Sequence, residues 1–93
     1  MATRHGSMAT ERPERYAKQL AGHWSAKTTV EDADDRTVLR FPNGNVVELR
    51  SVEGALDVTV SVPDRGDPDR FAQVVAEHLQ RFGHRDKLTV VWS

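Results

Sequence analysis

The chain has 93 residues, 38% of them hydrophobic, which is enough for one small domain with its own core. Its 13 Lys and Arg residues nearly balance 14 Asp and Glu residues, so the formal net charge is −1. This balance gives no global basic field to hold nucleic acid or anionic lipid, and the lack of cysteine excludes disulfides and thiolate chemistry.

The N-terminal segment, residues 1–7, lacks the apolar stretch of a signal peptide. No apolar run in the chain approaches the roughly 20 residues that a membrane span needs. We therefore expect a cytoplasmic protein with a single domain over residues 1–93. Gly6–Ser7–Met8 fits either a cloning remnant or natural sequence, so residues 1–7 are interpreted as flexible or partly vector-derived, with natural sequence as the alternative.

The first elements predicted are a weak edge strand over residues 4–10 and a helix from Pro13 to His23 or Trp24. The helix is predicted because apolar residues recur on one face. These residues are Tyr16, Ala17, Leu20, Ala21 and Trp24.

Four strands follow, separated by short turns. The strands are Lys27–Glu31, Arg36–Phe41, Val46–Ser51 and Leu56–Val62. The turns are an acidic segment (Asp32, Ala33, Asp34, Asp35), the hairpin turn at Asn43–Gly44, which tolerates positive φ, and Glu53–Gly54. Apolar and polar residues alternate strictly in the strand Leu56–Val62, which indicates a sheet with one face exposed to solvent.

A second helix is predicted from Pro68, with Asp67 as its cap and Gly83 as its stop. Its apolar stripe is Phe71, Val74, Val75, His78, Leu79 and Phe82. A last strand contains Leu88, Val90 and Trp92. Because only a few residues link it to the helix, we expect it to return beneath Leu79 and Phe82, so that Trp92 meets Phe82.

The predicted order is β-α-β-β-β-β-α-β. Four consecutive strands with short turns form an antiparallel meander, and only the two helices carry apolar stripes that can cover its apolar face. The fold class is therefore α+β, a two-layer sandwich with a mostly antiparallel sheet and both helices on one face.

Two histidines are candidates for chemistry. His78 lies within the apolar stripe of the second helix, and His23 at the end of the first helix is placed to approach it. One interpretation is a ligand or proton-transfer role; the other, which we favour, is a hydrogen-bonded histidine at the edge of the core. No metal site is predicted, since two histidines lack further ligands and the acidic turn lacks the glycine and distal glutamate of an EF-hand.

A basic set spans both helices. Cations near the end of the second helix complement its dipole, and together with cations of the first helix they form a candidate patch for an anionic ligand. The candidate ligand-binding residues are Arg12, Arg15, Lys18, His23, His78, Arg81 and Arg85. No catalytic residue and no cofactor are predicted, because no serine lies in a nucleophile elbow and no glycine loop cradles phosphate.

Three segments resemble one protein family. They are Arg15–Leu20 followed by His23, Phe41–Pro42 with Gly44, and the tail His78–Phe82, Arg85, Leu88–Val90 and Trp92. Together they resemble the small bacterial proteins grouped as domain of unknown function 2218, over about Met8 to Trp92. The resemblance implies a free-standing bacterial domain with relatives fused or adjacent to siderophore-interacting flavin reductases. It implies no accepted activity, and Val46 stands near the place of a cysteine frequent in that family.

Two hypotheses follow from different classes of function. In the first, the chain is a binding or accessory module for an anionic small molecule or a protein partner, with a role in siderophore-iron handling that rests on the resemblance. In the second, it is a small enzyme with His78 or His23 as general base. The enzyme needs a pocket and a carboxylate such as Glu77 or Asp57 beside the histidine.

Overall fold

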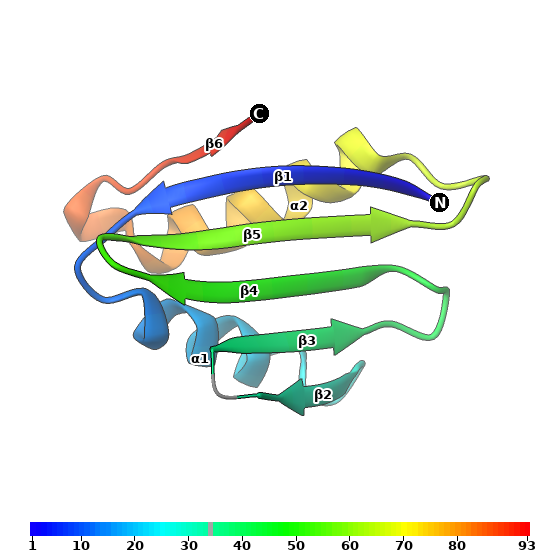
Figure 1. Cartoon of the computed structure of the whole chain (residues 1–93), viewed down its shortest axis with the longest axis horizontal. Helices are drawn as coiled ribbons and strands as arrows, with labels where there is room; N and C mark the ends of the chain where they lie inside the picture. Colours follow the sequence, from blue (N-terminus) through cyan, green and yellow to red (C-terminus); the bar gives the residue numbers. More distant parts are fainter. Residues whose placement is uncertain (34) are drawn as a thin grey trace.

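In the computed structural model, which describes residues 1–33 and 35–93, two helices cover one face of a six-stranded sheet (Figure 1). The elements in chain order are β1 (Ala2–Ala9), α1 (Pro13–Trp24), β2 (Thr29–Asp32), β3 (Arg36–Arg40), β4 (Val46–Val52), β5 (Ala55–Val62), α2 (Pro68–Phe82), the short 3-10 helix η1 (His84–Asp86) and β6 (Val90–Trp92). This confirms the predicted order of helices and strands and the α+β class.

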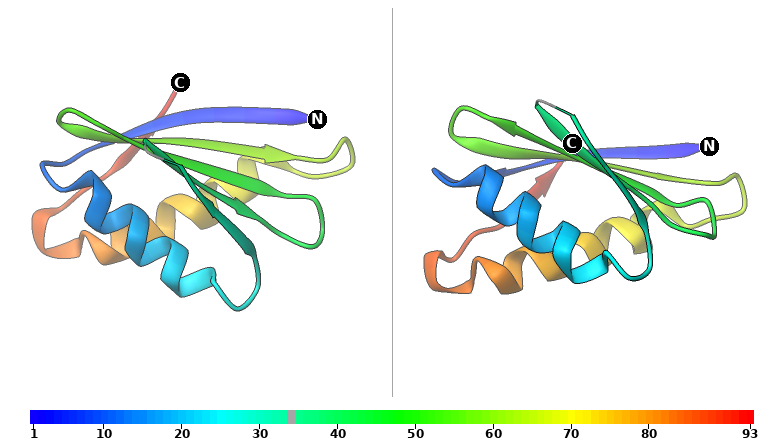
Figure 2. Two further views of the ribbon diagram at one scale, coloured as in Figure 1. Left: turned by 60° about the horizontal axis from the view of Figure 1, so that its bottom comes forward. Right: turned by 90° about the horizontal axis from the view of Figure 1, so that it is seen from below.

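The sheet has the strand order β2-β3-β4-β5-β1-β6, and all neighbouring strands are antiparallel. Tight turns join the strands of the meander. Gly44 and Gly54 have φ angles of 93° and 79°, a left-handed conformation that disfavours residues with a side chain. Both helices lie on the same face of this sheet and cross each other in the two views of Figure 2.

The prediction that residues 4–10 form an edge strand is wrong. β1 pairs with β5 from Ala2↔Val62 to Ala9↔Ala55 and with β6 on its other side, so it lies inside the sheet. The structure thereby places residues 2–7 in a strand. The two edge strands are β2 and the short β6.

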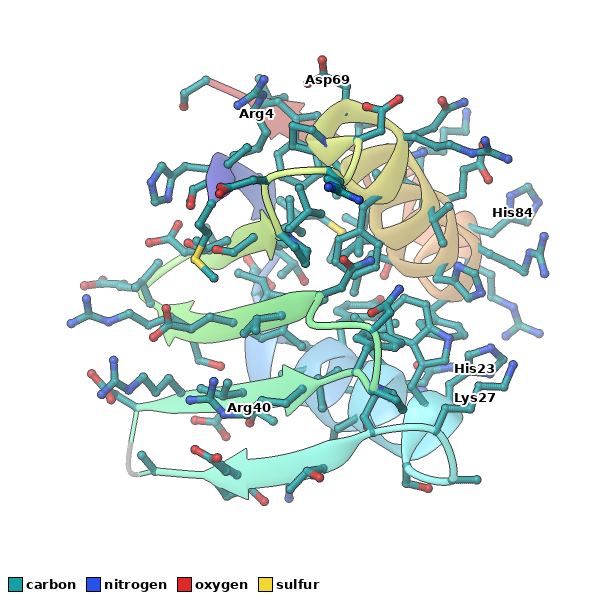
Figure 3. The ribbon with its side chains drawn as sticks, turned by 90° about the vertical axis from the view of Figure 1, so that its right-hand side faces the viewer. Arg4, His23, Lys27, Arg40, Asp69 and His84 are labelled. Carbon is teal, nitrogen blue, oxygen red and sulfur yellow. The ribbon has the colours of Figure 1, made fainter. Side chains whose placement is uncertain are left out.

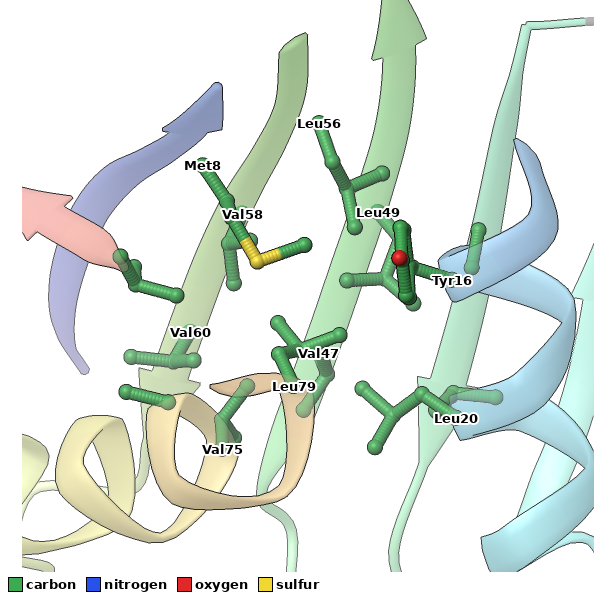
Figure 4. Packing of buried hydrophobic residues seen from close by; sticks show 14 of the residues in the cluster. Met8, Tyr16, Leu20, Val47, Leu49, Leu56, Val58, Val60, Val75 and Leu79 are labelled. Carbon is green, nitrogen blue, oxygen red and sulfur yellow. The ribbon is translucent and has the colours of Figure 1, made fainter. Parts of the chain in front are cut away.

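The core lies between the helices and the sheet (Figure 4). Alternate residues of β5 face it, and all of them are buried: Leu56, Val58, Val60 and Val62. Val47 and Leu49 of β4 are buried beside them, directly opposite Val60 and Val58. The strict alternation read from the sequence therefore does mark the covered face, and the opposite face of the sheet is open.

α2 begins and ends as predicted, but it is rotated relative to the predicted stripe. The Asp67 carboxylate accepts hydrogen bonds from the backbone N–H groups of Asp69 and Arg70, and Gly83 is the C-cap. Ala72 and Ala76 are buried with Val75 and Leu79, whereas Val74 is 36% exposed. Two alanines let the helix lie close to the sheet, which turns Val74 to the outside.

Two strands begin later than predicted. β2 begins at Thr29 rather than Lys27, because the Lys27 N–H and the Thr28 hydroxyl both donate to the Trp24 carbonyl and continue the end of α1. β6 begins at Val90 rather than near Leu88, because η1 and the left-handed Lys87 (φ 55°) occupy the connection.

The predicted contact between Phe82 and Trp92 is wrong. Leu88 packs against Gly83 at the end of α2, and β6 then runs back along the helix. Trp92 therefore lies beside Ala72 and Ala76, and Phe82 is about 9 Å further along the helix axis than Ala76. The indole of Trp92 covers Gly6 of β1 and is half-buried.

The close approach of Trp92 to β1 gives a test of the strand order. A Cβ added at Gly6 would lie 2.7 Å from Cε3 of Trp92, so Gly6→Ala is expected to destabilise the protein by about 1–3 kcal/mol through overpacking. A Cβ at Gly22 in α1 meets nothing within 4 Å, so Gly22→Ala is expected to stabilise by roughly 0.5–1 kcal/mol.

Urea denaturation of the two variants measures the difference. In a Trp92→Ala background the cost of Ala at position 6 is expected to fall below about 0.5 kcal/mol, since the clashing ring is gone. An unchanged cost in that background would contradict the placement of β6 beside β1.

Candidate functional site

Six rings form a cluster between the end of α1, the residue after β3, and α2 from its first turn to its last. The ring cluster consists of His23, Trp24, Phe41, Phe71, His78 and Phe82. Trp24, which is buried, is central to it: its ring centre is 5.3 Å from that of Phe41 and 4.8 Å from that of His78. The contact of Trp24 with Phe41 is edge-to-face, a geometry that stabilises beyond the area it buries.

The expectation that His23 approaches His78 is confirmed. Their ring centres are 5.0 Å apart, and the ring centre of His23 is also 5.9 Å from that of Phe82. His78 is half-buried and His23 is exposed. The two helices therefore present two imidazoles side by side at the surface.

A backbone hydrogen bond fixes the ring of His78. Its Nδ1 lies 2.7 Å from the Val74 carbonyl oxygen, one turn earlier in α2. A carbonyl oxygen can only accept, so Nδ1 carries the proton and donates it. In the neutral ring Nε2 then keeps a lone pair and is free to accept a proton or a metal ion.

The structure divides the predicted basic set into three groups. Lys18 lines a hollow between α1 and the β2–β3 hairpin, together with Asp32 and Asp35. Arg12 lines another hollow where α1 begins, beside η1, which contains Arg85. In that corner the Tyr16 hydroxyl donates to Asp86 over 3.4 Å.

The remaining two cations lie on the helices that carry the histidine pair, Arg15 on α1 and Arg81 on α2. Arg15 lies eight residues before His23 in α1, just over two turns, which places it about 80° around the helix from His23, and Arg81 follows His78 by three residues in α2. We call this surface (Arg15, His23, His78 and Arg81) the seam. In Figure 3, the labelled side chains of His23, Lys27 and His84 lie on the helical side of the molecule, opposite the open face of the sheet.

The cations of the helical layer differ from those of the sheet in their partners. On the sheet, Arg36 pairs with Glu48 and Arg40 with Glu31, at 2.9 Å and 2.8 Å. Arg50 likewise pairs with Asp35. Among residues 1–33 and 35–93, none of the five candidate cations lies within ion-pair distance of a carboxylate: Arg12, Arg15, Lys18, Arg81 and Arg85.

Neither carboxylate named for the enzyme hypothesis is placed to assist a histidine. Asp57 alternates with the core residues of β5 and therefore faces the open side of the sheet, with the strands between it and His78. Glu77 accepts a hydrogen bond from Gln73 and lines a hollow on the β6 side of α2.

The Met1 ammonium, by a hydrogen bond and its charge, lowers the pKa of Asp64, which belongs to the β5–α2 loop.

In the described part of the acidic turn, each aspartate has a side-chain partner. Asp32 accepts a hydrogen bond from the Thr37 hydroxyl, and Asp35 pairs with Arg50. The predicted Asp34 lies outside the described residues. Within the described ranges, no group of three or more His, Asp or Glu side chains is arranged to hold a metal ion.

A hollow that the sequence did not indicate lies between α2 and β6. It has a volume of about 430 Å³, with Trp92 and the two small residues Ala72 and Ala76 in its walls. The ion pair of Arg4 with Asp69, 2.9 Å, lies at its rim. The sequence signal for it was the alanine pair at helical spacing, which leaves space beside a large ring.

The fold and the seam define a small α+β domain in which a one-sided helical layer carries two adjacent imidazoles and candidate cations that have no ion-pair partner among residues 1–33 and 35–93. The chain belongs to the family described as "Uncharacterized protein conserved in bacteria (DUF2218)", whose model matches residues 5–93. This confirms the family that the three sequence segments resemble. In the described part of the chain, neither helix is long and apolar enough to cross a membrane.

A solved structure of another protein shares the fold over almost the whole length of both chains. The chain is similar to PA4090 from Pseudomonas aeruginosa, a structure determined by NMR, with 30% sequence identity and a TM-score of 0.72. The match covers 99% of this chain and 96% of that chain. The curated proteins compared with the chain include no match.

The hydrogen bond from His78 to Val74 gives a spectroscopic prediction. Long-range ¹H–¹⁵N spectra at mildly alkaline pH are expected to show His78 as the Nδ1–H tautomer, because the carbonyl oxygen requires that proton. The exposed His84 provides the comparison, and it is expected to show the Nε2–H form that free imidazoles prefer. An Nε2–H signature for His78 would contradict the arrangement of the seam.

Proposed function

We propose that this chain is a cytoplasmic binding module that holds an anionic small molecule at the seam. The observation that carries the proposal is the unequal pairing of its cations. The sheet arginines are neutralised by carboxylates, whereas Arg15 and Arg81 are exposed and have no ion-pair partner among the described residues. Exposed guanidinium groups with free donors favour a ligand that carries carboxylate, phenolate or phosphate oxygens.

The rings of the seam suit a flat anion. His23, His78 and Phe82 offer edges and faces of aromatic rings on the same two helices that carry Arg15 and Arg81. Arginine also stacks on planar groups, so charge and shape select the same kind of ligand. A ferric tricatecholate siderophore combines several negative charges with flat aromatic rings.

An accessory role in siderophore-iron handling is the concrete form of this proposal. Its support is the family resemblance, which implies relatives that are fused or adjacent to siderophore-interacting flavin reductases. In this role the module either holds the ferric complex or docks to such a reductase. Calorimetry tests both forms, because the ferric complex and the reductase can each be titrated into the protein.

Calorimetric titration with a ferric tricatecholate tests the proposal. We expect saturable binding at one site, and the variant Arg15→Gln/Arg81→Gln is expected to weaken it about tenfold or more, since hydrogen bonds to charged groups contribute roughly 1.5–3 kcal/mol each. Added salt is expected to weaken binding to the unchanged protein.

The matched control is Arg36→Gln/Arg40→Gln, which removes the same charge from the open face of the sheet. This control is expected to bind as the unchanged protein does. A ferric trihydroxamate, which lacks the negative charge, is expected to give no heat. Equal losses in both double variants, or no heat with the tricatecholate and the reductase alike, would refute the proposal.

A further inference from the structure

The two imidazoles of the seam come from different helices and are held in place by other rings. His78 is held by its hydrogen bond to Val74 and by the ring of Trp24 at 4.8 Å. The ring of Phe82 lies 5.9 Å from that of His23. The ring of His78 therefore keeps its position without any contact from a ligand, which lowers the entropy cost of binding one.

The hydrogen bond of His78 is of the kind that orients a metal-binding histidine. Ligating imidazoles commonly donate their other ring N–H to a backbone carbonyl or a carboxylate, which fixes the tautomer and makes the free nitrogen more basic. Here the carbonyl of Val74 takes the Nδ1 proton, and Nε2 is left as the ligand atom.

The separation of the rings fits a shared ion. A metal bonded to two neighbouring imidazole nitrogens at about 2.0–2.1 Å holds the two ring centres roughly 4.5–5.2 Å apart. The ring centres of His23 and His78 are 5.0 Å apart. His23 is exposed, so its ring can rotate to bring a nitrogen to an ion held by Nε2 of His78.

We propose that His23 and His78 together bind a divalent transition-metal ion, with Cu²⁺ bound more tightly than Ni²⁺ or Zn²⁺. Neutral imidazoles suit these ions, and the order follows the general stability series for nitrogen ligands. No third His, Asp or Glu joins the pair among residues 1–33 and 35–93, so water fills the remaining coordination positions. The site uses two residues of the seam, but its test does not depend on the anion proposal, because the metal ion alone is the ligand.

Fluorescence of Trp24 reports on this site directly, since bound Cu²⁺ quenches a neighbouring indole. Trp92→Phe leaves Trp24 as the sole tryptophan and lies outside the seam. In this background, Cu²⁺ is expected to quench with one-site saturation, and a chelator is expected to restore the signal. No anionic ligand is present, so the outcome does not depend on the proposed function.

Three histidine variants locate the ion. His23→Gln and His78→Gln are each expected to weaken quenching at least tenfold, whereas His84→Gln, the matched control on η1, is expected to leave it unchanged. The side chain of His23 is exposed and makes no side-chain hydrogen bond within the described residues, so its variant is expected to keep the far-UV circular dichroism of the unchanged protein.

Zn²⁺ gives a second readout that does not use fluorescence. It is expected to shift the ring resonances of His23 and His78 together, and those of His5 and His84 not at all. Quenching that persists in His23→Gln, quenching lost in His84→Gln, or ring shifts confined to one histidine would mean adventitious ion binding only and would overturn the proposal.

Discussion

The packing of Trp24 is the constraint on which the seam depends. Four strands separate α1 from α2 in the chain, so no short link sets the position of one helix against the other. Trp24 makes this connection by side-chain contact, because its buried ring touches Phe41 after β3 and His78 on α2. Its backbone is fixed as well: the Trp24 carbonyl accepts from Lys27 N–H at 2.9 Å and from the Thr28 hydroxyl at 2.8 Å.

The one-sided cover of the sheet separates two kinds of charged surface. On the open face, arginines pair with carboxylates of a neighbouring strand or of the β2–β3 turn, and these surface pairs stabilise by about 0–1 kcal/mol each but cancel one another's charge. On the helical layer the candidate cations lack such partners among the described residues. The formal net charge of −1 therefore conceals a surface on which positive charge is available to a ligand.

Local signals predicted the elements, and distant contacts explain the errors. Asp67, Pro68 and Gly83 delimit α2 through the backbone, and Gly44 and Gly54 mark turns by their positive φ angles. β1 carries no such signal, since its partners lie far along the chain and Gly6 weakens any strand pattern. That glycine is needed because the Trp92 ring covers it, a contact that only the folded sheet creates. The sequence likewise placed His78 in the stripe of the second helix and His23 at the end of the first, but it did not predict the hydrogen bond that leaves Nε2 free.

The position of Trp24 between the sheet and α2 is tested most directly by nuclear Overhauser effects from its indole protons. Ring centres 4.8 Å and 5.3 Å apart bring protons well within range, so cross-peaks from Trp24 to both His78 and Phe41 are expected. Cross-peaks from Trp24 to Phe41 and to α1, with none to His78, would show that the helices do not meet there, and the seam would not exist.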